Sequence, residues 1–341
     1  MPGHFVHRIV PEGASLDDCR RLLEEAHGAD SEFELGYVPD CDGDRGNIVL
    51  WDEERQSARP LEAQETFALA VLSELAYASV VRDHGAIKKE GDKALAVVCN
   101  DATSLRIEAI AAALGAKVFR TETGEANVVS RARMLREEGW RVRILGEGSN
   151  GGVIIHPSSV RDPLSTIGSL VKLSVLRGKL CPFRHWLLAT GRGEGFFETF
   201  GLSDVADSLP RWTTTSVFEK RAALTISNKS AVEIKRLFFD TLPAFEDKAR
   251  SILGTSFAEP RFSVLQSRGT SEEPVKSRET IGKGGLKVLI QSGNQSVGFV
   301  WMRESGTEPL FRIMADIQGS HPDIEAALLE LLETIIVKLD R

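Results

Sequence analysis

A short acidic loop is the first candidate for chemistry. The residues Asp40-Cys41-Asp42-Gly43-Asp44-Arg45 place a carboxylate at every second position. In a tight loop, carboxylates with this spacing can surround one point, and hard oxygen ligands suit Mg²⁺, Mn²⁺ or Ca²⁺. We therefore predict that Asp40, Asp42 and Asp44 bind a metal ion. Arg45 cannot be a ligand, but it could hold a phosphate or orient the metal-bound group. The alternative is a loop that Arg45 and nearby backbone amides neutralise without a metal.

The obvious rival for this loop is the calcium-binding EF-hand. An EF-hand loop needs glycine at its sixth position and a bidentate glutamate at its twelfth. Counted from Asp40, those two positions hold Arg45 and Trp51. The sequence therefore excludes an EF-hand.

A second loop, residues 146–152, reads Gly-Glu-Gly-Ser-Asn-Gly-Gly. Its glycines allow the backbone to approach a ligand closely. Glu147, Ser149 and Asn150 offer donors and acceptors that suit sugar hydroxyls, so we predict that they bind sugar. A tight turn without a ligand is the alternative. The loop does not match the dinucleotide fingerprint, because neither the glycine spacing nor the following helix fits.

A third loop combines arginine with small polar residues. Residues 303–309 read Arg-Glu-Ser-Gly-Thr-Glu-Pro, and Arg312 follows. Arginine presents a bidentate fork for phosphate, and hydroxyls and amides around a glycine can complete a nest of donors for an anion. A charged hairpin turn is the alternative. We predict a phosphate site formed by Arg303, Ser305, Gly306, Thr307 and Arg312.

Predicted strands flank or precede each loop. Strands at 33–38 and 47–51 flank the acidic loop, a strand at 141–145 precedes the second loop, and strands at 297–302 and 310–317 flank the third. Further predicted elements are helices at 15–27 (with Ser15 as N-cap), 62–84, 103–114, 128–138, 163–176, 230–252 and 322–338, strands at 95–99, 117–119 and 286–291, linkers at 86–92 and 210–215, and a mobile loop at 267–285.

Alternation of strands and helices between residues 95 and 176 predicts an α/β domain with a largely parallel sheet. Strands grouped beside helices near the end predict a small α+β domain. We therefore expect a multi-domain chain of mixed or parallel α/β domains with a C-terminal α+β domain. Its segments are 1–85 (partial α/β, acidic loop), 86–205 (α/β, second loop) and 206–341 (linker and C-terminal domain, third loop).

Composition limits the partners. The net charge of −7 argues against nucleic acid or an anionic membrane, which both need a basic face. No apolar run reaches the length of a membrane span and no secretory signal is visible, so a cytoplasmic location is expected. The four cysteines lack metal-binding spacing and are interpreted as reduced thiols. The oligomeric state is left open.

Together and in this order, the three loops resemble those of the α-D-phosphohexomutase superfamily, which includes phosphoglucomutases, phosphomannomutases and phosphoglucosamine mutases. The family's D-G-D-G-D-R loop matches residues 40–45, with Cys41 in place of a glycine. Its G-E-x-S-G/N loop matches Gly146, Glu147 and Ser149, and its R-x-S-G-T-E-P loop matches residues 303–309 without a change. Residues 120–128 are similar to a family segment that precedes the sugar loop.

The resemblance implies four domains and an isomerase of carbohydrate metabolism that interconverts hexose 1-phosphate and 6-phosphate. In that family a phosphoserine donates its phosphoryl group to the sugar, a hexose 1,6-bisphosphate forms, and its other phosphoryl group returns to the serine. The resemblance implies that Asp40, Asp42 and Asp44 hold Mg²⁺ with Arg45 as a catalytic residue. It assigns sugar binding to the second loop and phosphate binding to the third.

One part of the family pattern is absent. The nucleophile loop, T-A-S-H-N-P, has no match, and only 39 residues precede Asp40, where the family has a further domain. We therefore expect a truncated mutase that is inactive as this chain. The alternative is a non-catalytic module that binds sugar phosphate and metal. A metal-dependent phosphatase is a weaker third hypothesis, because the match at residues 303–309 argues against it.

Overall fold

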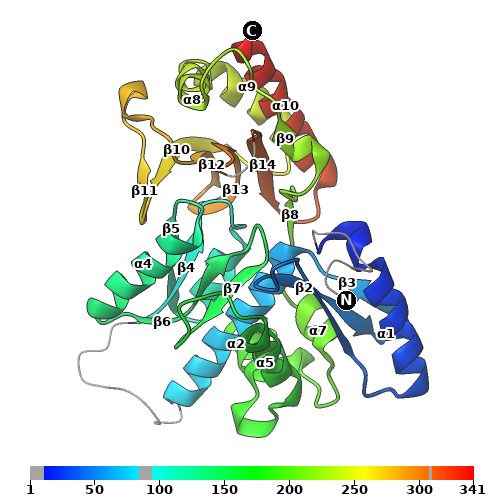
Figure 1. Cartoon of the computed structure of the whole chain (residues 1–341). Helices are drawn as coiled ribbons and strands as arrows, with labels where there is room; N and C mark the ends of the chain where they lie inside the picture. The colour runs from blue at the N-terminus through cyan, green and yellow to red at the C-terminus, as the bar shows by residue number, and fades with distance from the viewer. Residues whose placement is uncertain (1–10, 84–93, 307–308) are drawn as a thin grey trace. The chain divides into compact units, whose positions relative to one another are not determined.

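The computed structural model describes residues 11–83, 94–306 and 309–341, which form two compact units (Figure 1). The first unit contains the described residues up to 99, with 107–119 and 129–210. The second contains 100–106, 120–128 and the described residues from 211 to 341. The three-segment division at residues 85 and 205 stays a prediction. No helix in the described parts of the chain is long and apolar enough to cross a membrane.

The first unit holds two sheets and most of the helices. One sheet, in the order β1-β2-β3, is antiparallel, and the other has the order β5-β4-β6-β7. Strand β4 pairs with β6 in parallel, whereas β6 and β7 form an antiparallel hairpin. The strands are β1 Leu35–Pro39, β2 Gly46–Asp52, β3 Ser57–Pro60, β4 Leu95–Asn100, β5 Ala116–Thr121, β6 Arg141–Glu147 and β7 Gly152–Ile155. The helices are α1 Asp17–Ala29, α2 Ala63–Asp83, α3 Arg106–Ala113, α4 Glu125–Glu137, α5 Pro163–Val175, α6 Pro182–Ala189 and α7 Leu202–Asp207.

Helix α2 is central to the core of the first unit. Its residues Phe67, Val71 and Leu75 recur at helical spacing and are fully buried, as the pattern predicts. Helix α5 lies beside α2 (Figure 1), and the Ser73 hydroxyl donates to the Ser169 carbonyl oxygen at 2.6 Å. Because α2 is apolar nearly all round, it can be packed on several sides at once.

The second unit is a single antiparallel sheet covered by helices. The strand order is β11-β10-β12-β13-β14-β8, and β9 pairs with β14. Helices α8, α9 and α10 gather on one face of this sheet (Figure 1). The strands are β8 Trp212–Thr214, β9 Ala223–Leu224, β10 Arg261–Arg268, β11 Ser271–Pro274, β12 Leu286–Ser292, β13 Gln295–Glu304 and β14 Phe311–Gln318, and the helices are α8 Ala231–Asp240, α9 Leu242–Leu253 and α10 Pro322–Asp340.

The fold class and most of the predicted elements are confirmed, and several predictions need correction. Leu16, not Ser15, is the N-cap of α1. The single helix expected at 230–252 is two helices, because Thr241 ends α8 and precedes the first residue of α9. The segment interpreted as a mobile loop contains β11 and pairs it with β10. Strand β8 lies within the expected linker at 210–215. The sequence did not predict strands β3, β7, β9 and β10 or helices α6 and α7. The linker at 86–92 lies outside the described residues.

A buried lysine holds one turn of the second unit. Lys235 on α8 is fully buried, and its Nζ donates to the carbonyl oxygens of Gly282, Lys283 and Gly284 at 2.5, 2.8 and 2.5 Å. Burial lowers the pKa of the Lys235 ammonium to about 8, and the carboxylate of Glu122 partly opposes that effect. The three carbonyls satisfy the ammonium while it is charged.

This lysine predicts a pH dependence of stability. Its folded-state pKa lies below the unfolded value of about 10.4. Between those values the unfolded chain keeps a proton that the folded chain has released, so the free energy of unfolding rises with pH. We expect a rise of about 1 kcal/mol from this group between pH 8 and 9. Urea unfolding of wild type, Lys235→Met and the exposed control Lys248→Ala would measure it, and an equal pH slope in wild type and Lys235→Met would contradict it.

Candidate active site

The acidic loop closes the hairpin between β1 and β2. The register pairs Pro39 with Gly46, and the Asp40 N–H donates to the Arg45 carbonyl oxygen at 2.9 Å. Gly43 adopts a φ of 71°, a conformation that glycine takes without steric cost. The loop is therefore a tight turn that returns the chain after six residues.

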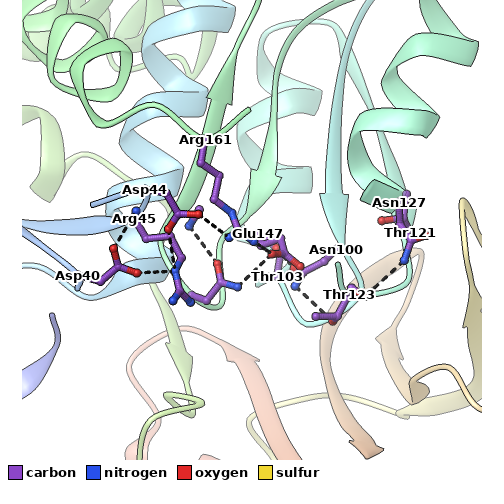
Figure 2. A network of polar contacts seen from close by, with 12 residues as sticks. Asp40, Asp44, Arg45, Asn100, Thr103, Thr121, Thr123, Asn127, Glu147 and Arg161 are labelled. Carbon is purple, nitrogen blue, oxygen red and sulfur yellow. Dashed lines mark hydrogen bonds and ion pairs between the residues drawn. The ribbon is translucent and has the colours of Figure 1, made fainter. Parts of the chain in front are cut away.

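The turn brings its three carboxylates together. One oxygen from each of Asp40, Asp42 and Asp44 lies within 4.8 Å of the other two. Asp40 is buried, Asp44 is partly buried and Asp42 is exposed. The Arg45 Nε lies 2.7 Å from Asp40 Oδ2 and 3.4 Å from Asp44 Oδ1, so Arg45 is a counter-charge for Asp40 and Asp44 (Figure 2).

The second loop joins β6 to β7 as a hairpin turn. Glu147 pairs with Gly152 in register, and the Asn150 N–H donates to the Glu147 carbonyl oxygen at 3.1 Å. The Asn150 side chain stabilises the turn, because its Nδ2 donates to Glu147 Oε2 at 3.1 Å and its Oδ1 accepts from the Gly152 N–H at 3.0 Å. A Cβ on Gly146 would lie 2.2 Å from the Gly152 carbonyl oxygen, so this position requires glycine. Ser149 is buried in the same turn.

Arg161 connects these two loops within the first unit, although no motif in the sequence marks it. One guanidinium nitrogen of Arg161 lies 3.1 Å from Asp44 Oδ2, and another contacts Glu147 Oε2 (Figure 2). Glu147 is almost completely buried, so its carboxylate needs this cation. Arg161 lies 117 positions from Asp44 along the chain, and no local pattern in the sequence marks such a pair.

The charges around the acidic loop fit a divalent cation. Among the described residues, the contacts named above connect four carboxylates (Asp40, Asp42, Asp44 and Glu147) and two guanidiniums (Arg45 and Arg161), which leaves two negative charges. Asp44 Oδ1 is buried and accepts no hydrogen bond from the described residues. Oxygen ligands of an octahedral Mg²⁺ lie about 3–4.2 Å apart, which is close to the spacing of these carboxylates.

The bridge that Arg161 forms can be tested by mutation. Its replacement by glutamine should lower the free energy of unfolding by about 1–2 kcal/mol, because the buried Glu147 loses a charged partner. Arg161→Lys should lose less, since it keeps the charge but not the fork that reaches both carboxylates. Urea unfolding measures both, with the exposed Arg133→Ala as control. Wild-type stability in Arg161→Gln would show that the bridge is not a stabilising contact.

The third loop lies in the second unit, between β13 and β14. The Ser305 N–H donates to the Leu310 carbonyl oxygen at 2.8 Å, which closes the turn. Arg303 and Arg312 lie directly opposite each other in the strand register, so both point to the same face of the sheet. Like charges in directly opposed positions are destabilising, and an anion bound between them would remove that cost. Gly306 is exposed in this turn, whereas Thr307 lies outside the described residues.

Glu122 is a neighbour of this loop in the same unit. Arg303 Nη2 lies 3.4 Å from Glu122 Oε1, and Glu122 Oε2 accepts from the Gly269 N–H at 3.0 Å. Arg312 Nη1 donates to the Val217 carbonyl oxygen at 2.9 Å. The segment 120–128, which is similar to a family segment, therefore contacts the arginine of the third loop through Glu122.

Comparison with known proteins identifies one domain directly. Residues 74–179 match the family model described as Phosphoglucomutase/phosphomannomutase, alpha/beta/alpha domain III. This segment is similar to the phosphoglucomutase/phosphomannomutase domain that the model describes. The match agrees with the superfamily predicted from the three loops, and the matched segment contains the second loop and Arg161. A search of curated proteins found no match.

Solved structures support the fold of the phosphohexomutases. A phosphoglucomutase/phosphomannomutase family protein from Burkholderia thailandensis is 17% identical with a TM-score of 0.50, and the match covers 95% of this chain and 50% of that one. The open form of parafusin, a phosphoglucomutase from Paramecium, is 14% identical with a TM-score of 0.51, covering 98% of this chain and 50% of that one. The chain thus spans about half the length of these structures, and at this identity the likeness shows the fold.

Proposed function

We propose that this chain supplies three loops of a Mg²⁺-dependent phosphohexomutase that interconverts hexose 1-phosphate and 6-phosphate. They are the metal loop (the acidic loop, residues 40–45), the sugar loop (the second loop, residues 146–152) and the phosphate loop (the third loop, residues 303–309). The observation that carries the proposal is the cluster of three aspartates that Arg161 connects to the buried Glu147. It joins an oxygen-ligand site and a sugar-type loop within one unit. The phosphoglucomutase/phosphomannomutase match at residues 74–179 supports the same reaction.

Each loop has a distinct role in this proposal. Asp40, Asp42 and Asp44 would hold Mg²⁺, which when bound supplies charge neutralisation for phosphoryl transfer. Arg45 neutralises Asp40 and Asp44 and orients the loop. Hexose hydroxyls would bind to the sugar loop.

The phosphate loop would hold the phosphate that does not react. Arg303 and Arg312 provide two forks on one face of the sheet, and Ser305, Gly306 and Thr307 complete the set. Fixing the non-reacting phosphate positions the sugar, and positioning contributes much of the rate enhancement in such reactions. The same loop would accept either phosphate of the hexose 1,6-bisphosphate intermediate.

The 341 residues contain no match to the family motif that carries the phosphoryl donor. Ser149 belongs to the sugar loop, and Ser227 precedes α8, where its N–H donates to Asp340 Oδ2 at 2.9 Å. We therefore propose that the 341 residues alone bind Mg²⁺ and hexose phosphate without turnover. The second candidate function, a non-catalytic sugar-phosphate and metal-binding module, rests on this same missing motif.

A mutase assay combined with calorimetry tests the proposal. The assay would use glucose 1-phosphate and mannose 1-phosphate, Mg²⁺ and a trace of hexose 1,6-bisphosphate. Binding of Mg²⁺ and of either sugar phosphate without turnover is the expected result. Turnover would show that a phosphorylated residue exists outside the family motif. No binding of metal or sugar phosphate would overturn the proposal.

A further inference from the structure

A cavity of about 280 Å³ lies beside the β10–β11 hairpin of the second unit. We call it the β10–β11 cavity, and its lining includes Gln266, Arg268, Glu273, Val275, Lys276 and Thr280. None of the described residues of the three loops is among those that line it. Its volume is near the lower limit for small-molecule sites, which start at about 300 Å³, so it suits a small ligand.

The amide of Gln266 has a fixed orientation in this cavity. The side chain is 3% exposed, and its Oε1 accepts from the Gly282 N–H at 3.1 Å and from Arg268 Nη2 at 3.2 Å. Both partners are donors, and only the oxygen of an amide can accept. The hydrogen bonds therefore assign the nitrogen as well as the oxygen.

The amide nitrogen is left with unused donors. Gln266 Nε2 is buried and has no hydrogen-bond partner among the described residues. Buried polar side-chain atoms are bonded in the large majority of cases, and an exception requires an explanation. A bound group with an acceptor oxygen would satisfy this nitrogen.

The charges at the cavity select the type of acceptor. Arg268 and Lys276 are both exposed at the rim. Arg268 has donors beyond the one that contacts Gln266, and the Lys276 ammonium can turn toward a ligand. Glu273 is the one carboxylate among the lining residues, and its Oε1 already accepts from the Ser271 hydroxyl at 3.1 Å. Two cations beside one carboxylate favour an anion, and charged oxygens form the stronger hydrogen bonds.

We propose that the β10–β11 cavity is a second small-molecule site that binds an oxyanion, a carboxylate or a phosphate group. One oxygen accepts from Gln266 Nε2, and Arg268 and Lys276 hold the charge. The site is separate from the phosphate loop, because Arg303, Ser305 and Arg312 do not line it. It therefore does not depend on the mutase proposal.

The side-chain amide of Gln266 provides a local readout. Protein labelled with ¹⁵N-glutamine is titrated at constant ionic strength with inorganic phosphate and, separately, with acetate. The Gln266 amide signal, assigned through its backbone, should shift saturably with at least one of them, and the stronger of the two identifies the anion class. Arg268→Ala and Lys276→Ala should each weaken binding about tenfold, the loss of one charge-assisted contact.

Two controls separate this site from other effects. Lys248→Ala removes an exposed lysine of the same unit that does not line the cavity and should leave the titration unchanged. Arg303→Ala, which alters the phosphate loop, should also leave the Gln266 response unchanged. The proposal is overturned if neither anion shifts the Gln266 signal, or if the shift persists unaltered in both Arg268→Ala and Lys276→Ala.

Discussion

Replacing Asp42 with alanine should reduce the affinity for Mg²⁺ about a hundredfold or more. Asp42 is exposed, and its carboxylate lies within 4.8 Å of those of Asp40 and Asp44. Loss of a residue that only supports a metal ligand costs about 10–100-fold in affinity, so loss of a ligand should cost at least as much. Calorimetric titration with MgCl₂ measures the change directly.

The same variant should behave in the opposite way without metal. In EDTA, Asp42→Ala removes one negative charge from a cluster in which four carboxylates face two guanidiniums, so its melting temperature should equal or exceed that of wild type. Mg²⁺ should then raise the melting temperature of wild type more than that of the variant, because a ligand stabilises the state that binds it. A change in the order of the two melting temperatures between EDTA and Mg²⁺ is specific to a metal site.

Glu54→Ala is the matched control for this experiment. It removes one carboxylate from an exposed position of the same unit, so the net charge of the chain changes equally. It should bind Mg²⁺ as wild type does. If Asp42→Ala also binds Mg²⁺ as wild type does, the three aspartates are not the ligands.

The residues that form each loop could be predicted from the sequence, because they are close together in the chain. The acidic loop is a turn of six residues, and the alternation of carboxylates is enough to predict that Asp40, Asp42 and Asp44 converge. The third loop was placed correctly between two strands for the same reason. Its opposed pair, Arg303 and Arg312, follows from a hairpin register that the strand boundaries nearly determine.

The contacts that the sequence could not predict are those between residues far apart in the chain. The contacts of Arg161 with Asp44 and Glu147, and of Glu122 with Arg303, join segments that no periodicity links. The β10–β11 hairpin was missed because residues 267–285 are rich in glycine and polar side chains. One glycine of this segment, Gly285, allows close packing instead, since a Cβ there would lie 2.0 Å from Asp101 Oδ2.

The contacts of the buried Asp101 carboxylate could not be predicted from the sequence either. It is 1% exposed, and its oxygens accept from the Ser267 hydroxyl at 2.5 Å, Trp301 Nε1 at 2.8 Å and the Thr123 hydroxyl at 2.8 Å. It directly follows the buried strand β4. Here three donors satisfy it, and one of them, the Ser267 hydroxyl, itself accepts from the Gly285 N–H at 2.9 Å.

The second large effect is expected at the phosphate loop. Arg303→Ala should weaken binding of glucose 6-phosphate about a hundredfold, since a bidentate guanidinium–phosphate contact comprises two charge-assisted hydrogen bonds of about 1.5–3 kcal/mol each. Arg303→Lys should bind with intermediate affinity, because lysine keeps the charge but cannot provide the fork. Calorimetry at fixed ionic strength measures both variants.

The stability of Arg303→Ala separates phosphate binding from a structural role. The variant loses the 3.4 Å ion pair with Glu122, but it also relieves the repulsion with the opposed Arg312, so its free energy of unfolding without ligand should change by less than about 1 kcal/mol. The exposed Arg211→Ala, in the same unit, should bind as wild type does. A large loss of stability together with unchanged affinity would instead make Arg303 a structural partner of Glu122, and the opposed arginines would need another explanation.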